Sequence, residues 1–302
     1  MSEKAPEKAG QPEKLEQLQK KRVTPENLLK AAGVVVIIQL VALLITSQNL
    51  PTYRIIVNET GPSYAPLGTS TPGSAGNAVL LVGFAFVLTL GLVWLLRRKM
   101  IMSFKVVIFG STAFAAFVLT LVTSDIFAAN YLPQAFELPI AFGAASFVVV
   151  LIGYTIFVKN NVWLSSAILA FVGAQVGSFF AETLPPTTAL ILPIAFSLYD
   201  IYAVFRGPLK ALIGTNPNIA LAGMSIKAGE FTLGLGDIVF YTMLPSLALF
   251  TPKLGLVPSI YTIIAIDTGM VLTLYLLSKK RLLPGLPIPM FLGILVLGFY
   301  LL

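Results

Sequence analysis

Histidine and cysteine are both absent from the 302 residues, and these absences exclude several common kinds of enzyme site. Without them the chain forms no disulfide, no zinc site built on Cys or His, and no haem site with a histidine ligand. The Ser-His-Asp and Cys-His nucleophile systems are excluded as well. Acid–base chemistry must therefore rely on Asp, Glu, Lys or Tyr. We expect no metal ion and no other cofactor.

Charged residues are also scarce, and this scarcity excludes an ordinary soluble domain. They make up 11% of the chain, whereas a soluble domain has about 25%. Hydrophobic residues make up 57%, and the mean hydropathy is +0.89. The net charge of +7 does not point to nucleic acid, because the basic residues lie between apolar runs. The composition predicts an all-α protein that crosses the lipid bilayer several times.

The chain divides into a polar tail and a single membrane domain. Residues 1–23 have no apolar period and predict a disordered tail, after which Thr24 and Pro25 predict the start of a helix. We expect six spans within 24–206, a cytoplasmic loop at 207–230 and three spans within 231–302. Each apolar run is about 20 residues, the length that crosses the hydrocarbon layer. The nine runs are 27–48, 78–96, 104–124, 138–158, 162–181, 187–206, 231–250, 257–277 and 284–302.

Lysine and arginine predict the orientation of these spans, because they concentrate in cytoplasmic loops. With a cytoplasmic N-terminus, only Arg54 and Lys253 fall in outer loops. The inner loops then hold Arg97, Arg98, Lys99, Lys105, Lys159, Arg206, Lys210, Lys227, Lys279, Lys280 and Arg281. This asymmetry predicts an N-terminus inside and a C-terminus outside. It also places residues 49–77 in a long outer loop.

Three aspartates lie inside apolar runs, where an ionisable side chain is costly and is a candidate for function. Asp200 lies about 9 Å from the inner end of the sixth span, and Asp237 about 10 Å from the inner end of the seventh. Asp267 lies about 18 Å deep in the eighth span, off the level of the other two. Two carboxyls at one depth on neighbouring helices predict a pair that shares a proton. One carboxylate can then activate water while the other protonates a carbonyl oxygen.

Other interpretations of these acids remain open at this point. Asp200 and Asp237 could be buried acids whose hydrogen bonds join two helices. For Asp267 we expect a hydrogen bond to a neighbouring Thr, Tyr or backbone group. The acids at span ends are expected at the membrane interface; they are Glu182, Asp125 and Glu230.

Three short motifs surround the two level aspartates. Tyr199-Asp200 lies in the sixth span, Gly234-Leu235-Gly236-Asp237 in the seventh, and Pro284-Gly285-Leu286-Pro287 opens the ninth. In these motifs the sequence resembles the presenilin and signal-peptide-peptidase family of intramembrane aspartyl proteases, and most of all its archaeal presenilin homologues. The family has Tyr-Asp, Gly-x-Gly-Asp and Pro-Ala-Leu-Pro in the same spans. Gly285 departs from this pattern, which puts the rigidity of its segment in doubt.

The resemblance implies roles for these residues. Asp200 and Asp237 would be the catalytic pair. Gly234 and Gly236 would let another backbone approach, and Leu235 would shape a substrate subsite. Pro284 and Pro287 would keep a shaped, non-helical segment beside the site, with Gly285 and Leu286 inside it, and Pro289 would extend that effect. The role of Tyr199 stays open between packing and hydrogen bonding, and Pro193 and Pro245 are candidate kinks.

The resemblance also implies substrates and partners. They would be transmembrane proteins or peptides of type I, with the N-terminus outside, because the sixth span runs from outside to inside. The backbone at 224–233 would offer strand edges to the unwound substrate. The short loop at 207–230 predicts an uncut chain without obligatory partner subunits, and an oligomer stays open. The absence of a targeting tail predicts a prokaryotic cell membrane, and the resemblance implies an archaeal one.

Three rival functions remain. A proton- or cation-coupled transporter or channel would use Asp200, Asp237 and Asp267 as a path between Pro-broken helices. A prepilin-type aspartyl peptidase shares Gly-x-Gly-Asp, but should have fewer spans and no Pro-x-Leu-Pro segment. A non-catalytic member of the family, retained for binding, is the third, although both aspartates are intact.

Overall fold

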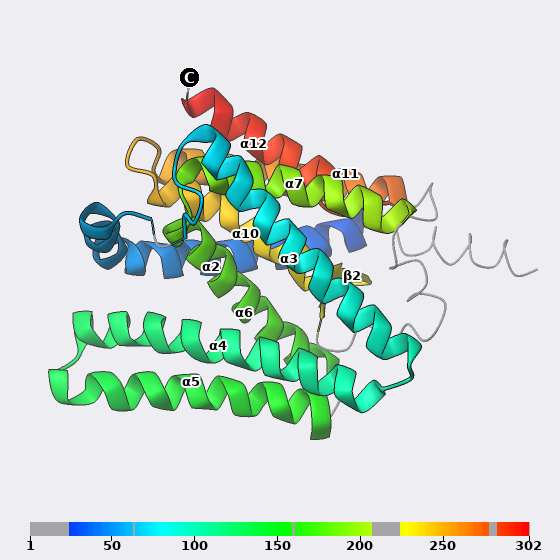
Figure 1. The fold of residues 1–302 in the computed structure, drawn as a ribbon, viewed down its shortest axis with the longest axis horizontal. Helices are drawn as coiled ribbons and strands as arrows, with labels where there is room; N and C mark the ends of the chain where they lie inside the picture. The colour runs from blue at the N-terminus through cyan, green and yellow to red at the C-terminus, as the bar shows by residue number, and fades with distance from the viewer. Residues whose placement is uncertain (1–23, 63, 159–160, 207–223, 278–282, 302) are drawn as a thin grey trace, which may run out of the picture.

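The computed structural model describes residues 24–62, 64–158, 161–206, 224–277 and 283–301, and this part of the chain is a bundle of helices with one small hairpin (Figure 1). The predicted tail at 1–23 and most of the predicted loop at 207–230 lie outside it. The helices are α2 Pro25–Thr60, α3 Thr71–Arg97, α4 Ile101–Tyr131, α5 Glu137–Gly153, α6 Val162–Thr183, α7 Pro186–Phe205, α10 Leu235–Phe250, α11 Leu256–Leu277 and α12 Pro287–Leu301. The strands are β1 Ser225–Ala228 and β2 Phe231–Gly234. A 3₁₀ turn covers Gln134–Phe136, and a π-helical turn covers Tyr154–Val158.

Within the described residues, each of the nine predicted runs corresponds to one of these nine helices. Seven of the helices are long and apolar enough to cross a membrane. The two others, α10 and α12, have 16 and 15 residues, fewer than the roughly 20 that a full crossing needs. The chain is therefore a multi-pass helical membrane protein, while the exact number of crossings stays a prediction.

Several helix boundaries differ from the prediction. Residues 49–60, expected in a loop, continue α2 through Pro51. Residues 71–77 of the same expected loop begin α3, and α4 continues beyond 124 to Tyr131. Asn49 and Tyr53 in this stretch are buried against the bundle, and such tertiary contacts override the local preference of Pro for a helix end. Residues 231–234, expected at the start of the seventh span, form β2 instead. The predicted helix start is confirmed, since Thr24 Oγ1 accepts from Asn27 N at 3.2 Å and Pro25 is the first helical residue.

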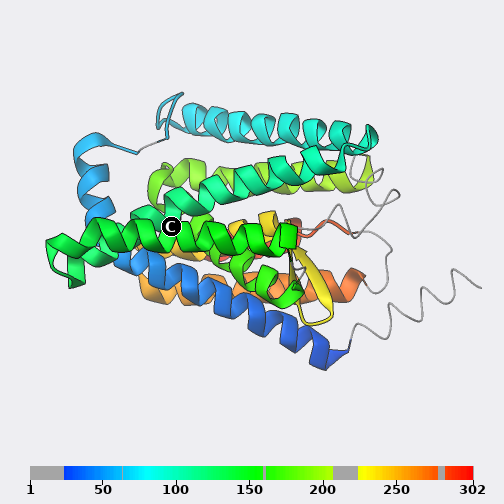
Figure 2. The ribbon, with the colours of Figure 1, turned by 90° about the horizontal axis from the view of Figure 1, so that it is seen from below.

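The centre of the bundle is α10, which packs against α6, α2 and α11. Every residue of α10 from Ile238 to Ala248 is buried. Two glycines of α6 face it, and at Gly177 the space for a Cβ is already taken by the Thr242 side chain and the Val239 carbonyl. The pair α4 and α5 lies at the edge of the bundle (Figures 1 and 2). The glycines of α6 thus let the two helices pack closely, and this contact positions α10 in the bundle.

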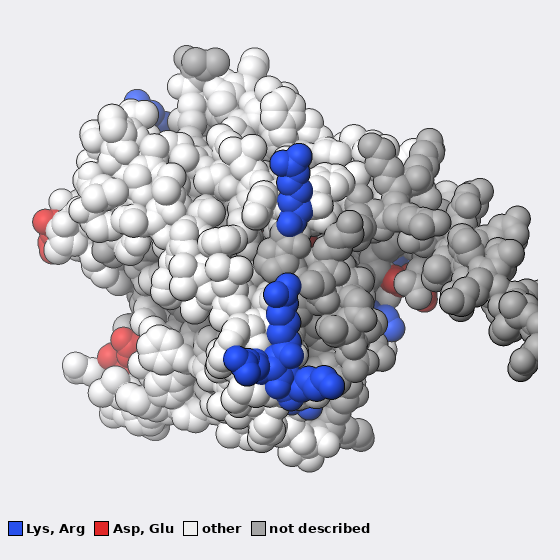
Figure 3. All heavy atoms as spheres, turned by 45° about the vertical axis from the view of Figure 1, so that its right-hand side comes forward, with Lys and Arg blue, Asp and Glu red and all other residues white. Residues whose placement is uncertain are grey.

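The ends of several helices and the hairpin lie at one end of the bundle. The start of α2, the α3–α4 connection, the end of α7 and the hairpin all lie towards the right of Figure 1. Basic side chains gather on this face of an otherwise mostly uncharged surface (Figure 3). This arrangement agrees with the prediction that these segments lie together on the cytoplasmic side of the membrane. Which side of a membrane the end faces stays a prediction.

The hairpin is antiparallel, with Ala228 opposite Phe231. Its two-residue turn begins at Gly229, whose φ of 60° is a conformation that favours glycine. Burial alternates along both strands, so one face packs into the bundle. Lys227 N donates to Ser166 Oγ of α6 at 2.9 Å, and Leu235 N donates to Met224 O at 2.9 Å. These two bonds fix the hairpin directly in front of α10.

The α6–α10 contact yields a prediction about stability. The change Gly177→Ala puts a methyl group 2.7 Å from the Val239 carbonyl oxygen and 3.0 Å from Met243 N. The two helices must separate, at a cost of about 1–3 kcal/mol. We expect a lower melting temperature of the purified protein in detergent. Gly91→Ala in α3 is the control, because nothing lies within 4 Å of its new Cβ; equal melting temperatures for the two variants would contradict the prediction.

Candidate active site

Asp200 lies on α7, five residues before the helix ends at Phe205. It is partly buried, and its Oδ2 accepts a hydrogen bond from Leu286 N at 3.1 Å. The backbone N–H of Gly285 also lies close to this carboxyl. The carboxyl of Asp200 therefore binds the backbone of the segment that precedes α12.

Asp237 lies in the first turn of α10, and its carboxyl faces the same segment. A Cβ built on Gly285 would lie 2.9 Å from Oδ2 and 3.2 Å from Cγ of Asp237. The carboxyls of Asp200 and Asp237 interact electrostatically across this short stretch. The structure thus brings the two acids to one dipeptide. The predicted position of Asp237 seven residues into its helix was wrong, because residues 231–234 are extended.

The segment before α12 is not regular helix, as its prolines predict. Residues 283–286 lie outside any helix, and α12 begins at Pro287. The expectation that Pro289 extends the irregular segment was wrong. Pro289 lies in the first turn of α12, where a missing N–H breaks no helical hydrogen bond. Leu286 is 5% exposed and belongs to the main core, and Pro284 is buried as well, so the residues on both sides of Gly285 are packed into the protein.

Tyr241 is a site residue that the sequence analysis missed. Its hydroxyl donates to the Gly285 carbonyl oxygen at 3.0 Å, and its side chain is 1% exposed. It follows Asp237 by four residues, so both lie on one face of α10. That spacing was visible in the sequence, although nothing there showed which backbone the hydroxyl would meet. Tyr241 holds the Gly285 carbonyl while Asp200 holds the Leu286 amide.

The two glycines before Asp237 have different surroundings. The nearest atoms to a Cβ on Gly234 belong to the Asp237 carboxyl, with Oδ2 at 3.2 Å, and a Cβ on Gly236 would meet nothing within 4 Å. Gly234 pairs with Ser225 of β1, and the approach of a substrate backbone to these glycines stays a prediction. The side chain of Leu235 packs against Gly173 of α6. Gly234 therefore leaves room for the carboxyl of Asp237 itself.

Comparison with known proteins connects this geometry with a family. A sequence model of the presenilin family matches residues 28–220, more than half of the chain. The chain belongs to the presenilin family. The match includes Asp200, whereas Asp237 and the Pro284–Pro287 segment lie beyond it.

Individual relatives agree with this assignment. Presenilin-B of Dictyostelium discoideum is 43% identical over 122 residues, which are 37% of this chain and 25% of that protein. The chain thus spans about a quarter of the length of this curated relative. The crystal structure of a presenilin family intramembrane aspartate protease in space group C222 has a TM-score of 0.62 at 19% identity, over 91% of this chain and 99% of the other. A second crystal form, in P2, has a TM-score of 0.60 at 19% identity, over 93% and 98%. At this identity the structures show that the presenilin fold is shared.

Tyr199 of this presenilin homologue packs among aromatic rings. Its ring meets Phe86 of α3 edge-on at 6.1 Å between centroids, and Phe196 at 6.3 Å. Its hydroxyl is buried and has no hydrogen-bond partner. Of the two roles left open for Tyr199, the structure shows packing.

The candidate kink residues Pro193 and Pro245 lie inside α7 and α10, which continue through them.

Asp267 and Glu182 lie on the predicted helices, α11 and the last turn of α6, in buried surroundings. Asp267 is 8% exposed, and among the described residues neither of its carboxyl oxygens has a hydrogen-bond partner, so the expected hydrogen bond was wrong. It borders a groove between α2 and α11, with Val36 and Leu40 on the opposite wall. Glu182, expected at the interface, is 1% exposed and contacts Asn49. Neither acid joins the carboxyls at Gly285.

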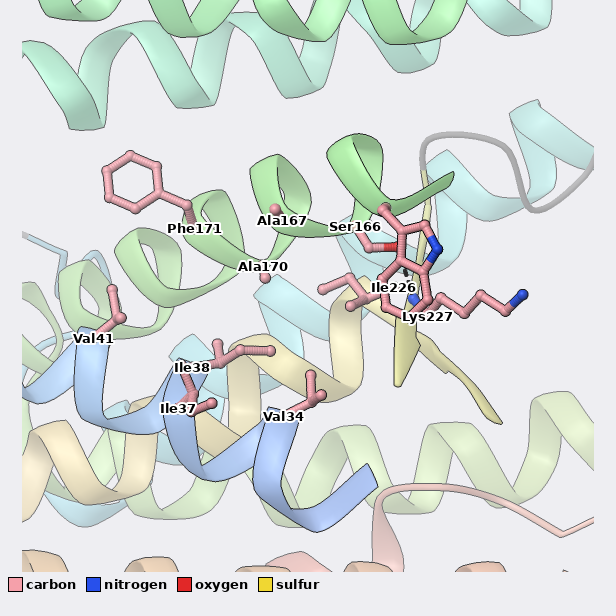
Figure 4. Close-up of a pocket in the computed structure, with 11 residues that line it drawn as sticks. Val34, Ile37, Ile38, Val41, Ser166, Ala167, Ala170, Phe171, Ile226 and Lys227 are labelled. Carbon is pink, nitrogen blue, oxygen red and sulfur yellow. Dashed lines mark hydrogen bonds between the residues drawn. The ribbon is translucent and has the colours of Figure 1, made fainter. Parts of the chain in front are cut away.

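A second groove lies between α2 and α6 and reaches the first strand of the hairpin (Figure 4). Its volume is about 310 Å³, and its walls are apolar apart from Ser166 and Lys227. No carboxylate lines it. In the described part of the chain, no cluster of three or more His, Cys, Asp or Glu residues is placed to hold a metal ion. The paired carboxyls therefore lie at Gly285 and not in this groove.

The approach of Asp237 to Gly285 can be tested by cross-linking. The chain has no cysteine, so two introduced thiols have no competitors. In the variant Asp237→Cys with Gly285→Cys, the first sulfur replaces an atom 3.2 Å from the new Cβ, which fits a disulfide. We expect both thiols to become unreactive towards maleimide after mild oxidation. The control pairs Gly236→Cys with Gly285→Cys and should stay reactive, and reactive thiols in the first pair would refute the geometry.

Proposed function

We propose that the protein is an intramembrane aspartyl endopeptidase that cuts peptide bonds within transmembrane segments, with Asp200 and Asp237 as its catalytic pair. The observation that carries this proposal is the approach of both carboxyls to one dipeptide, Gly285–Leu286. Membership of the presenilin family supports it. The proposal requires no metal or cofactor, since two carboxyls suffice for the proton transfers of peptide hydrolysis.

In the proposed mechanism the two acids divide the proton transfers. One carboxylate takes a proton from water as the water oxygen attacks the peptide carbonyl carbon. The other, protonated, acid donates to the carbonyl oxygen. As the C–N bond breaks, the acid that took the proton of water gives it to the leaving amine, and a hydroxyl of the tetrahedral intermediate returns its proton to the other carboxylate. Tyr241 and the Gly285 backbone hold this geometry, because Asp200 receives its orienting hydrogen bond from the segment that Tyr241 fixes.

The hairpin provides a surface for the unwound substrate. Its closing pair, Ala228 and Phe231, flanks a two-residue turn, so the next pair, Lys227 and Thr232, points its N–H and C=O groups outward. On β1 this edge is occupied, since Lys227 N donates to Ser166 Oγ. On β2 the edge at Thr232 leads directly to Gly234 and Asp237. We propose that the substrate pairs with β2 by strand addition.

The predicted orientation of the sixth span bears on the class of substrate. A sixth span that runs from outside to inside favours type I substrates, whose N-terminus lies outside. We propose that the chain acts uncut, without partner subunits, in a prokaryotic cell membrane of the archaeal kind. The purified protein alone is therefore the right material for the assays below.

The first test is cleavage of a tagged transmembrane peptide in detergent by the wild type and three variants. Asp200→Ala and Asp237→Ala each remove an acid–base group, so we expect cleavage to fall roughly 10²- to 10⁴-fold. Asp267→Ala should cleave at a rate close to that of the wild type, because Asp267 does not reach Gly285. A folded wild type that cleaves nothing, together with an ion flux that Asp267→Ala abolishes, would support the transporter instead.

A second test concerns the β2 edge. Thr232→Pro removes an outward N–H without touching the bonds between the strands, so kcat/KM should fall roughly tenfold for the loss of one hydrogen bond. Thr232→Val keeps the N–H and should act like the wild type. If both variants retain full activity, the substrate does not pair at this edge.

A third test concerns substrate orientation. We expect the purified protein, reconstituted in liposomes, to cut a tagged type I stub faster than a type II stub of the same transmembrane sequence. Mass spectrometry of the products gives both rates and the cleaved bond. Preferential cleavage of the type II stub would overturn the proposed orientation.

A further inference from the structure

One face of α2 carries buried polar side chains at a distance from the two aspartates. Thr46, Asn49 and Tyr53 are spaced by three and four residues, so they lie on one face of the helix, and they are 0%, 3% and 8% exposed. This face packs against α6, where Glu182 is 1% exposed. Gly173 of α6 meets α10 near Ile238, and Glu182 lies nine residues further along, about 13 Å away. The proposed dyad therefore makes no use of this polar face.

Glu182 is a carboxyl with an amide neighbour and no counter-charge. Asn49 Nδ2 lies 3.3 Å from Oε2 and 3.5 Å from Oε1 of Glu182. Among the residues that the structure describes, no basic side chain forms an ion pair with it. The basic residue of this stretch, Arg54, donates from Nη2 to the Phe250 carbonyl oxygen at 3.0 Å. An ionised carboxylate at such a buried place is costly unless a proton or a cation neutralises it.

Two further oxygens at this place form no regular hydrogen bond to any residue that the structure describes. Asn49 Oδ1, on the amide that already contacts Glu182, is buried and accepts no hydrogen bond. The Thr46 hydroxyl lies beside the same carboxyl without forming a regular hydrogen bond to it. A buried polar atom that lacks a partner destabilises the fold. Two such atoms beside one carboxyl indicate a ligand site rather than a packing defect.

The chemistry of these atoms defines what binds there. Carboxylate, amide and hydroxyl oxygens are hard ligands that suit alkali and alkaline-earth cations. A single carboxylate balances a single positive charge, so a monovalent ion leaves the buried site neutral. A water molecule would satisfy the free oxygens but leave the charge. We propose that Glu182, Asn49 and Thr46 form a binding site for a small monovalent cation, Na⁺ or K⁺, between α2 and α6.

Such an ion would join two helices that support the catalytic helix. Ser178 Oγ of α6 already donates to the Ala42 carbonyl oxygen of α2 at 2.9 Å, and a cation adds a second link one turn further on. Both helices pack against α10. Rotation of the Asn49 amide by 180° turns Oδ1 towards the ion in place of Nδ2. The bound ion therefore stabilises the folded bundle.

The test measures the melting temperature of the purified full chain in detergent, by the fluorescence of its two tryptophans. NaCl or KCl replaces choline chloride at constant ionic strength. For at least one of the two salts we expect a saturable rise of several degrees once the ion reaches roughly 100 times its Kd. Glu182→Gln should abolish the rise, because it removes the charge and keeps the size. Glu59→Gln is the control, since Glu59 is an exposed carboxyl on α2, the other helix of the proposed site.

The other outcomes overturn the proposal. A wild type that melts at the same temperature in choline, Na⁺ and K⁺ shows that Glu182 is neutral or hydrated. An undiminished response of Glu182→Gln shows that the ion binds elsewhere. If Glu182→Gln does not fold, Thr46→Val decides, because it removes one ligand and keeps the shape. The cation concentration at half-saturation should then rise roughly tenfold or more, and an unchanged value counts against the site.

Discussion

The interior of a bilayer offers no water, so every backbone group there needs a partner within the protein. The segment before α12 depends on this constraint more than any other described part of the chain. Its prolines keep it out of a helix, and its free amide and carbonyl must find side chains. Asp200 accepts from Leu286 N, and Tyr241 donates to Gly285 O. The contacts that satisfy this backbone are the same contacts that assemble the site, so fold and proposed chemistry depend on each other.

The position of α10 has a similar physical origin. Glycines of α6 allow its backbone to lie against α10, and small residues at helix contacts are the usual means of close packing in membranes. The hairpin is held to α6 by Ser166 and to α10 by Leu235 N. Asp237 follows within one turn. The edge of β2 and the carboxyl of Asp237 therefore lie close together because α6 holds both the hairpin and α10 in place.

The acids of this protein show that one residue type serves different purposes in different surroundings. Asp200 and Asp237 approach each other at Gly285. Asp267 of α11 borders the groove towards α2, and its carboxyl oxygens have no hydrogen-bond partner among the described residues. Glu182 lies against the amide of Asn49. All four occupy apolar stretches of the sequence, and hydropathy does not distinguish them. Their neighbours on other helices assign one pair to the proposed catalysis and leave two acids for other roles.

Composition and short motifs were enough to predict a multi-pass helical membrane protein, the positions of its helices and the candidate pair Asp200 and Asp237. These features are local: about 20 apolar residues form a span wherever they occur, and a buried acid is costly at any depth. Only the tertiary structure revealed four other features. They are the strand at 231–234, the helix that continues through Pro51, the hydrogen bond from Tyr241 to Gly285, and the contact of Glu182 with Asn49. Each joins residues far apart in the chain, and a single sequence carries no record of which distant groups meet. Burial against neighbouring helices overrides local preference at these places, and it decides where the free hydrogen-bonding groups find their partners.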